Sequence, residues 1–279
     1  MAQITPPGSY LGDVTTVADY LGFVDDWHSK NPGLPQRFHA GVWYRGLGQL
    51  YPAPLRPGVY RDPFTSRSAS MYGGTPEEKR LNTEREMLVE FRTTGAAFFD
   101  AGNVIDVYFT AQHYGMPTRL LDWTTNPLAG LFFAVENTGQ HGADGEVFVL
   151  NVGGMMPPVP PTADAEFPRG VMGMRHPYIT DAIGQSFWHS PKKKRDPFVL
   201  PIRPDNQPGR IGQQSSCFTL HMHEAGDVDA KAVVKLRVKA GGKAGMLREL
   251  HRMNINPFTI YNDLDHLSQS IKHAWGVSK

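Results

Sequence analysis

The spacing of hydrophobic residues predicts helices along much of the chain. They are expected at residues 14–29, 76–99, about 104–115, 126–137, about 241–253 and about 263–275. The helix at 126–137 has the clearest pattern, because Asn126 is a suitable N-cap and Pro127 fits the first helical turn. Apolar residues then follow at i, i+3, i+4 and i+7, which places them on one helix face.

Short runs of β-branched and aromatic residues predict strands between these helices. The expected strands lie within residues 39–47, 145–152, 197–204, 210–221 and 230–240. Helices and strands are interspersed without the strict alternation of a doubly wound fold. The predicted class is therefore α+β, with a mixed or antiparallel β core and with N-terminal, central and C-terminal helices.

The chain divides into an N-terminal segment and one larger domain. Residues 1–39 are expected to form a helical segment, and residues 40–279 to form the domain. Residues 152–196 are rich in proline, methionine and glycine and carry the run Lys-Lys-Lys-Arg. We expect this stretch to be an irregular excursion from the domain and not a second domain.

The composition favours a cytoplasmic protein with a packed core. The 279 residues are 40% hydrophobic and 20% charged, which disfavours global disorder. No stretch approaches the roughly 18 consecutive apolar residues that span a bilayer, so no membrane attachment is expected. The first residues lack the pattern of a secretory signal. Cys217 is the only cysteine, so no internal disulfide can form, which suits a reducing compartment.

The net charge of +1 is unevenly distributed along the chain. Residues 190–279 carry 15 Lys and Arg against 8 Asp and Glu, whereas the remainder carries 13 against 19. A basic C-terminal third attracts anionic partners such as nucleic acid or a phosphate-bearing cofactor. A solvated charged face explains the same distribution equally well.

Several common catalytic motifs are absent from the sequence. There is no GxxxxGK[ST] loop and no strand–GxGxxG–helix unit. Cys217 falls in an expected strand, where a buried and inert thiol is the usual case. His221 and His223 share a strand face, but two ligands do not make a metal site without a third. We therefore expect no metal centre.

Residues 111–124, AQHYGMPTRLLDWT, concentrate groups that ionise, stack and form charge-assisted hydrogen bonds around a Met-Pro break. The candidate residues in this motif are His113, Tyr114, Arg119, Asp122 and Trp123. The N-terminus of the following helix offers N–H groups and a positive dipole end to an anion, which would also meet Arg119. The alternative is structural, with an ion pair between Arg119 and Asp122 and with His113 in the core.

Two other motifs carry candidate residues. In WYRG, residues 43–46, Arg45 is suited to hold a phosphate or ribose, while Gly46 allows a ligand close to the backbone. An edge-strand arginine that points to water is the alternative. Further along, Gln213 and Gln214 cannot both face the core, because successive strand side chains alternate. One of them is expected in a cleft, where an amide orients a hydroxyl but does not act as a base.

Together these motifs resemble the FRG domain, which is named for a Phe-Arg-Gly motif. The segments that carry the resemblance are WYRG, LRPGVYR, AQHYGMPTRLLDWTTNPLAGLFFAVE, DGEVFVL, RIGQQSSCF and FTIYNDLDHLSQSI. The resemblance runs from about residue 40 to residue 275. Two positions depart from the family pattern: Tyr44 replaces its phenylalanine, and Ser216 replaces the glycine of Gln-x-Gly-x-Phe.

The order of the motifs resembles, more distantly, that of ADP-ribosyltransferases with an Arg–Ser/Thr–Glu layout, and implies their split sheet. This resemblance implies an NAD-dependent ADP-ribosyltransferase, a toxin or phage-defence effector, with nucleic acid, RNA or DNA, as the favoured acceptor. An antitoxin or other regulatory partner is compatible with that role. The implied catalytic residues are Arg45, His113, Tyr114, Asp122 and Gln214. The implied NAD-binding residues are Tyr44, Arg45, Gly46, Arg61, Arg119, Trp123, Thr124, Thr125 and Asn126.

Gln214 stands where those enzymes carry a glutamate that holds the ribose and stabilises an oxocarbenium-like transition state. A neutral amide stabilises that charge less than a carboxylate does, so Asp122 is an alternative source of negative charge. Without either, the chain is expected to be a non-catalytic nucleotide- or nucleic-acid-binding module. A nuclease is disfavoured, because no carboxylate cluster suited to magnesium is found.

Overall fold

The chain folds around one mixed β-sheet covered by helices. The computed structural model describes residues 10–30, 41–51, 55–61, 74–155, 171–188, 199–204, 215–223, 228 and 232–275. Within these residues helices and strands are interspersed, so the predicted α+β class is confirmed. None of the described helices has the length and apolar character needed to cross a membrane.

Eight strands form the sheet in the order β1-β8-β4-β2-β3-β7-β6-β5. The strands are β1 (Tyr10–Val14), β2 (Val42–Leu47), β3 (Leu120–Thr124), β4 (Gly145–Asn151), β5 (Met172–Gly173), β6 (Val199–Arg203), β7 (Ser216–His221) and β8 (Val233–Val238). The pairs β1–β8 and β5–β6 are parallel, and the other neighbours are antiparallel. The mixed sheet expected from the sequence is therefore present.

The centre of the sheet is split between β2 and β3. These two strands pair at the single position Tyr44–Thr124, whereas β2 pairs with β4 along its whole length. The sheet therefore consists of two halves, β1-β8-β4-β2 and β3-β7-β6-β5, that are joined at one residue pair.

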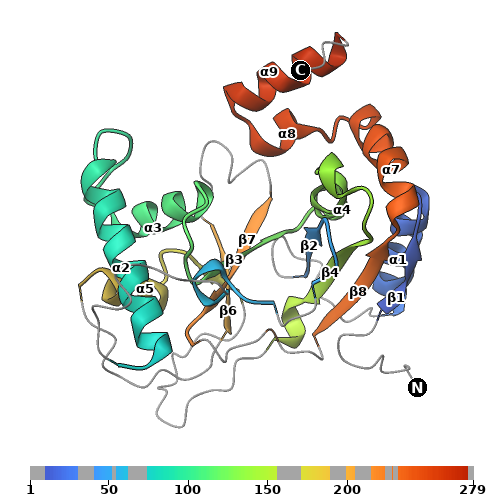
Figure 1. Ribbon diagram of the computed structural model, residues 1–279. Helices are drawn as coiled ribbons and strands as arrows, with labels where there is room; N and C mark the ends of the chain where they lie inside the picture. Colours follow the sequence, from blue (N-terminus) through green and yellow to red (C-terminus); the bar gives the residue numbers. More distant parts are fainter. Residues whose placement is uncertain are drawn as a thin grey trace.

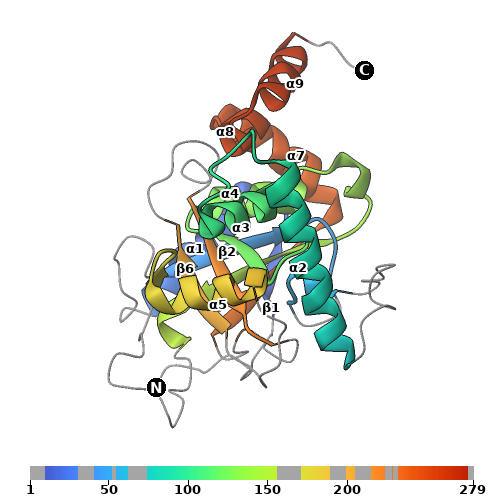
Figure 2. The ribbon, with the colours of Figure 1, turned by 90° about the vertical axis from the view of Figure 1, so that its left-hand side faces the viewer.

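Each half of the sheet carries its own helices. The helices are α1 (Val17–Lys30), α2 (Pro76–Thr94), α3 (Val104–His113), α4 (Pro127–Val135), α5 (Pro177–Trp188), α7 (Ala240–Arg252), α8 (Pro257–Tyr261) and α9 (Leu264–Ala274). Short 3-10 turns lie at Gly58–Tyr60, Thr138–Gln140 and Val152–Gly154. Figure 1 shows α1, α4 and α7 beside the first half, and α2, α3 and α5 beside the second. In Figure 2, α9 projects from α8 away from the rest of the molecule, whereas α8 lies close to the end of α7.

Three large hydrophobic clusters of the described residues hold this arrangement together. One packs α1, α4 and α7 onto β2, β4 and β8, around Tyr44, Phe132 and Leu236. A second packs α3 and α5 onto β3, β6 and β7, around Phe109 and Phe218. The third contains residues from both halves, including Trp43, Leu121, Trp123 and Phe148. This third cluster joins the halves where the strand pairing is weakest.

Several elements were not expected from the sequence, among them the strands β1 and β3 and the helix α5. Residues 152–196 were expected to be irregular, but Pro177–Trp188 form α5, and residues 156–170 and 189–198 lie outside the described residues. Ile179 and Ile183 of α5 are fully buried in the second cluster, so hydrophobic packing stabilises this helix despite the flanking prolines. Residues 10–14, for which no strand was expected, form β1, because they pair with β8.

Candidate functional site

A cavity of about 340 Å³ lies over the split of the sheet. It is at the lower end of the roughly 300–1,000 Å³ usual for ligand pockets. Its walls come from β2, the end of α3, β3, the end of α4, the start of β7 and α8. The lining residues are Tyr44, Arg45, Gly46, Leu47, Gly48, Gln112, His113, Asp122, Trp123, Thr124, Phe133, Glu136, Ser216 and Tyr261.

Arg45 of β2 reaches across the split and contacts β3. Its Nη1 donates to the main-chain oxygen of Asp122 at 2.8 Å and lies 3.9 Å from the Asp122 carboxylate. Its Nε is buried and has no hydrogen-bond partner among the described residues. Burial, together with the smaller effect of nearby Arg61, lowers the pKa of Arg45 to about 10, against the opposing effect of Asp122. The guanidinium therefore stays charged at neutral pH and retains an unused donor.

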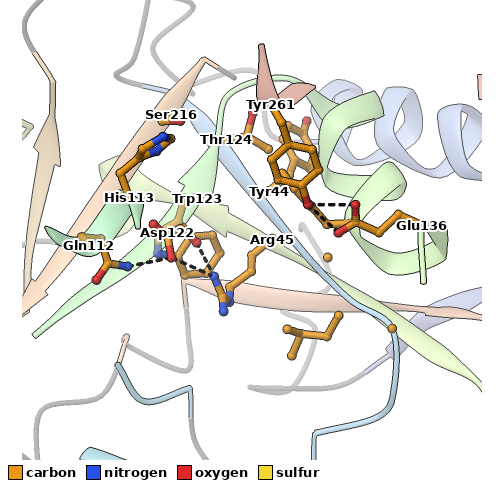
Figure 3. Close-up of a pocket in the computed structure, with 14 residues that line it drawn as sticks. Tyr44, Arg45, Gln112, His113, Asp122, Trp123, Thr124, Glu136, Ser216 and Tyr261 are labelled. Atoms are coloured by element: carbon orange, nitrogen blue, oxygen red, sulfur yellow. Dashed lines mark hydrogen bonds and ion pairs between the residues drawn. The ribbon is translucent and has the colours of Figure 1, made fainter. Parts of the chain in front are cut away.

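Asp122 presents a carboxylate to the cavity. Its side chain is 56% exposed, and its Oδ2 accepts a hydrogen bond from Nε2 of Gln112 at 2.8 Å. The Gln112 amide is itself held by Thr118, whose hydroxyl donates to Oε1 at 2.5 Å. Figure 3 shows Arg45, Gln112 and Asp122 as one connected group. This network orients the carboxylate before any ligand binds.

A second carboxylate, Glu136, lies away from this group in Figure 3. Glu136 follows the last turn of α4, and the hydroxyl of Tyr261 in α8 lies 2.8 Å from each of its carboxylate oxygens. Burial raises the pKa of Glu136, although the hydrogen bond from Tyr261 and the charge of His266 oppose this shift. The cavity thus holds one exposed and one largely buried carboxylate, in different electrostatic environments.

Tyr261 is fixed by the residues around it. The His266 ring stacks on it at a centroid distance of 4.2 Å, and Phe133 meets it edge-on at 6.1 Å. His266 Nδ1 lies 2.7 Å from a carboxylate oxygen of Asp263. The C-terminal helices therefore complete the cavity wall and control the orientation of Glu136.

Arg119 does not line the cavity, and the expected ion pair between Arg119 and Asp122 is not formed. Its side chain is fully buried, and its Nε donates to Glu84 at 2.9 Å. The Tyr108 hydroxyl also donates to Glu84, at 2.7 Å. Burial opposes the charge of Arg119, but Glu84 and Tyr108 raise its pKa above the usual value. The arginine is therefore a core residue that joins α2 to β3.

The N-terminus of α4 is not a free anion-binding site, because its N–H groups are already capped. The side chain of Asn126 accepts hydrogen bonds from the N–H groups of Leu128 and Ala129. Thr124 lines the cavity, but its hydroxyl accepts from Asn126 N, and Thr125 contacts the main chain of Ser215. Asn126 and Thr125, which the resemblance assigned to NAD binding, therefore organise the β3–α4 connection.

The aromatic candidates separate into cavity and non-cavity residues. The Trp123 indole is 3% exposed, belongs to the third cluster and donates to Thr219, so its ring is not available for stacking. Tyr114 is 71% exposed and does not line the cavity. His113 does line it, edge-on to Tyr114. Tyr44 is buried, and burial raises its pKa well above the usual value.

Gly46 lies at the cavity, but a packing requirement explains it. A Cβ at this position would overlap the carbonyl oxygen of Gly130 and lie 2.6 Å from Ala134 N, both in α4. The absence of a side chain lets β2 approach the helix backbone closely.

Near the end of β2, the buried Lys243 donates to the carbonyls of Gly48 and Gln140 at 2.6 and 3.1 Å.

The remaining candidate residues lie beside the cavity or outside the residues that the structure describes. Arg61 donates to the Arg56 carbonyl and contacts the Tyr51 ring. Gln213 and Gln214 lie outside the described residues, and Ser216 lines the cavity. Cys217 is buried, and burial raises its pKa to about 12, so the thiolate is disfavoured. The described residues contain no cluster of three or more His, Cys, Asp and Glu that could hold a metal ion.

The Glu136–Tyr261 pair and the supporting role of Gln112 were not predicted from the sequence. All three lie inside motifs that carried the family resemblance, in AQHYG, FFAVE and FTIYND. Glu136 and Tyr261 are 125 positions apart, so no local spacing connects them. A polar residue at the end of an otherwise apolar helix was the one available signal for Glu136.

The model of the FRG domain matches residues 40–143. The FRG resemblance is thus confirmed for the segment that supplies β2, α3, β3 and α4, and with them most of the cavity lining. Neither a curated protein nor a solved structure matches the chain.

Proposed function

We propose that this FRG-domain chain is an NAD-dependent ADP-ribosyltransferase that acts on nucleic acid, as a toxin or phage-defence effector. One observation carries the proposal. A guanidinium with a buried, unused Nε donor and two carboxylates in different environments line a single cavity at a sheet split. Cleavage of a glycosidic bond commonly uses two such carboxylates around an oxocarbenium-like centre.

Arg45 is suited to the anionic part of NAD. A charged guanidinium with limited water access forms strong hydrogen bonds to phosphate oxygens. Arg61 adds positive charge nearby. The cavity is small, so in this proposal it holds the nicotinamide riboside end, and the rest of the dinucleotide extends along β2 towards Arg61.

Asp122 is suited to the charge that develops on the ribose. When the bond between C1′ and the nicotinamide nitrogen breaks, its electron pair leaves on the nicotinamide and C1′ becomes positive. A carboxylate already oriented by Gln112 stabilises that charge without reorganisation. His113, on the same cavity wall, orients the substrate or moves a proton.

The test is release of nicotinamide from NAD by the purified protein, alone and with RNA, DNA or protein added. The proposal expects release that depends on nucleic acid and falls in Arg45→Ala and Asp122→Asn. The absence of release under every condition would reject the transferase. Growth arrest of a bacterial host on expression, relieved by the same substitutions, tests the toxin role.

A non-catalytic nucleotide- or nucleic-acid-binding module is the second candidate. The 56% exposure of the Asp122 side chain favours it, because solvent screens a carboxylate and weakens its effect on a developing charge. Binding of NAD or an oligonucleotide without nicotinamide release would support this second function.

A further inference from the structure

A second cavity, of about 510 Å³, lies next to the first. It is open to solvent on one side and lies among α4, α7, α8 and α9, and its lining residues are Phe132, Glu136, Thr138, Leu247, His251, Asn256, Pro257, Tyr261, His266, Gln269 and Ser270. Glu136 and Tyr261 line both cavities. One carboxylate therefore faces two separate spaces, and Tyr261 holds it at their boundary.

The second cavity has the lining expected for an uncharged heterocycle. Phe132, Leu247 and Pro257 supply apolar surface, and the exposed amide of Gln269 can both donate and accept. The Ser270 hydroxyl is buried and has no hydrogen-bond partner among the described residues. A polar atom in this state gains from a ligand that pairs with it. Pockets that bind nucleobases combine apolar faces with polar groups at the base edge.

The surface beside this cavity is suited to a polyanion. Arg248 and Arg252 are exposed on α7, and Lys272 is exposed on α9, the two helices that form much of the cavity wall. Asp265 is an exposed acidic residue on α9. Glu249 of α7 is partly exposed as well, so three cations stand against two acids on these helices. The remaining positive charge favours the phosphate backbone of nucleic acid over an acidic or neutral protein surface.

We propose that this second cavity binds the acceptor nucleobase and that Glu136 takes the proton from its attacking group. The binding part stands on the cavity itself, and the proton transfer rests on the function proposed above. The base enters from the α8–α9 side, and NAD occupies the cavity at the sheet split. Glu136 lies between the two ligands.

The transfer step joins the acceptor to the ribose and releases neutral nicotinamide. A nitrogen or hydroxyl oxygen of the acceptor forms a bond to C1′ of the ribose, and the bond from C1′ to nicotinamide breaks. The bonding electron pair leaves on the nicotinamide nitrogen, which becomes neutral. The proton of the attacking N–H or O–H moves to the Glu136 carboxylate, which later releases it to water. A base in this position contributes roughly 10²–10⁴-fold to a rate.

The residues around Glu136 suit this role. Tyr261 is the one hydrogen-bond donor to the Glu136 side chain among the described residues, and it leaves further lone pairs unused. Burial raises the pKa of Glu136, which makes this carboxylate a stronger base than an exposed one. His266 and Asp263 hold Tyr261 and are positioning residues, since they act through it.

A matched pair of variants tests the binding part. Ser270→Phe fills the second cavity, whereas Ser268→Phe makes the same change at an exposed position of the same helix that does not line the cavity. The probes are fluorescently labelled short single strands of DNA and RNA and the free nucleosides, each without NAD. We expect Ser270→Phe to weaken binding about tenfold or more, and Ser268→Phe to bind as the wild type. Circular dichroism and thermal melting establish that both variants fold.

Comparing strands with free nucleosides, and binding with nicotinamide release, distinguishes the possible outcomes. Binding of strands and nucleosides alike identifies the base as the recognised group, whereas binding of strands alone adds the phosphate backbone. Equal binding by wild type and Ser270→Phe, or binding of protein acceptors only, overturns the proposal. If wild type releases nicotinamide but Ser270→Phe still binds the strand normally, the transferase stands and the base site fails. If no nicotinamide is released but Ser270→Phe loses the strand, the base site stands and the transferase fails.

Glu136→Gln tests the proton transfer. Transfer should fall about 10²-fold or more, and the acid limb of the pH–rate profile should disappear, while the KM of the acceptor changes little. A purely structural role would not remove the acid limb. A Glu136→Gln enzyme with the wild-type transfer rate and pH profile would show that Glu136 is not the base.

Discussion

The Arg45 guanidinium donates to the main-chain oxygen of Asp122 across the split of the sheet, at 2.8 Å, and lies 3.9 Å from the carboxylate of the same residue. One arginine thus contacts both the backbone and the side chain of the opposite strand. The strands at this position are not joined by a regular ladder, so the side chain takes the place of the missing backbone bonds. Substitutions at the two residues should therefore have separable effects on binding and on turnover.

Arg45→Ala should raise the KM for NAD about 10-fold to 100-fold. A hydrogen bond to a charged group contributes about 1.5–3 kcal/mol, and Arg45 is the proposed phosphate contact. Steady-state nicotinamide release measures the effect, and Arg203→Ala, at an exposed position of β6 outside the cavity, is the control. An unchanged KM in Arg45→Ala would remove this residue from NAD binding.

Asp122→Asn should lower turnover about 10²-fold while the Kd for NAD stays close to the wild-type value. The amide keeps the shape and a hydrogen-bond acceptor for Gln112, but it loses the charge that opposes the positive ribose. Single-turnover kinetics and calorimetry separate the two quantities. Asp25→Asn, at an exposed position of α1, controls for the loss of one negative charge. Equal turnover in Asp122→Asn and wild type would exclude the electrostatic role.

Glu84→Gln should destabilise the fold by about 3–5 kcal/mol, because it leaves the Arg119 charge buried without its carboxylate. Urea unfolding measures the loss, and Glu90→Gln, exposed on the same helix, should change stability little. NAD binding by the folded fraction should persist, since Arg119 lies outside the cavity. A stable Glu84→Gln protein that no longer binds NAD would show that Arg119 contributes to NAD binding.

Gly46→Ala should destabilise the protein by about 1–3 kcal/mol through overpacking. The added methyl group meets the backbone of α4, which cannot move without shifting the helix. Gly48→Ala is the matched control, because there the methyl group meets the flexible Gln140 side chain. Thermal and urea unfolding of both variants give the comparison. Similar losses at the two positions would contradict the packing explanation.

The pKa of Glu136 predicts a pH-dependent difference in stability. Its folded-state pKa is raised by burial, so its contribution is fully present below the unfolded value of about 4.3 and is lost as pH rises through the folded value. Glu136→Gln removes this loss. The free energy of unfolding of Glu136→Gln, relative to wild type, should therefore increase as pH rises from acid towards neutral. A constant difference across that range would mean that burial does not perturb this carboxyl group.

Local patterns in the sequence predicted most of the elements. Asn126 and Pro127 correctly placed the start of α4, and Pro76 the start of α2, because capping depends on neighbouring residues. The strand β1 escaped prediction, since its five residues are stabilised by β8, more than 200 positions away. The helix α5 escaped because its composition favours coil and its stability comes from tertiary packing.

The site was predictable only in part, because it too depends on contacts between residues far apart in the sequence. Arg45 was found because an arginine is unusual in a strand, and Asp122 because the motif AQHYGMPTRLLDWT concentrates ionisable and aromatic residues. Arg119 has the same chemistry, but its partner Glu84 lies 35 positions away, so the sequence could not show that the charge is already satisfied. Glu136 was not recognised as a site residue, because its partner Tyr261 lies 125 positions away and only the folded structure brings the two together at the cavity wall.

The single Tyr44–Thr124 pair between β2 and β3 has a mechanical consequence. Widening the split sacrifices very few backbone hydrogen bonds, whereas the cluster around Trp43 and Trp123 resists separation of the two halves. The two half-sheets are therefore held together mainly by the side chains of the third cluster and not by backbone hydrogen bonds between β2 and β3. A ligand that lies over the split meets the Arg45–Asp122 contact, which joins the two half-sheets at this point.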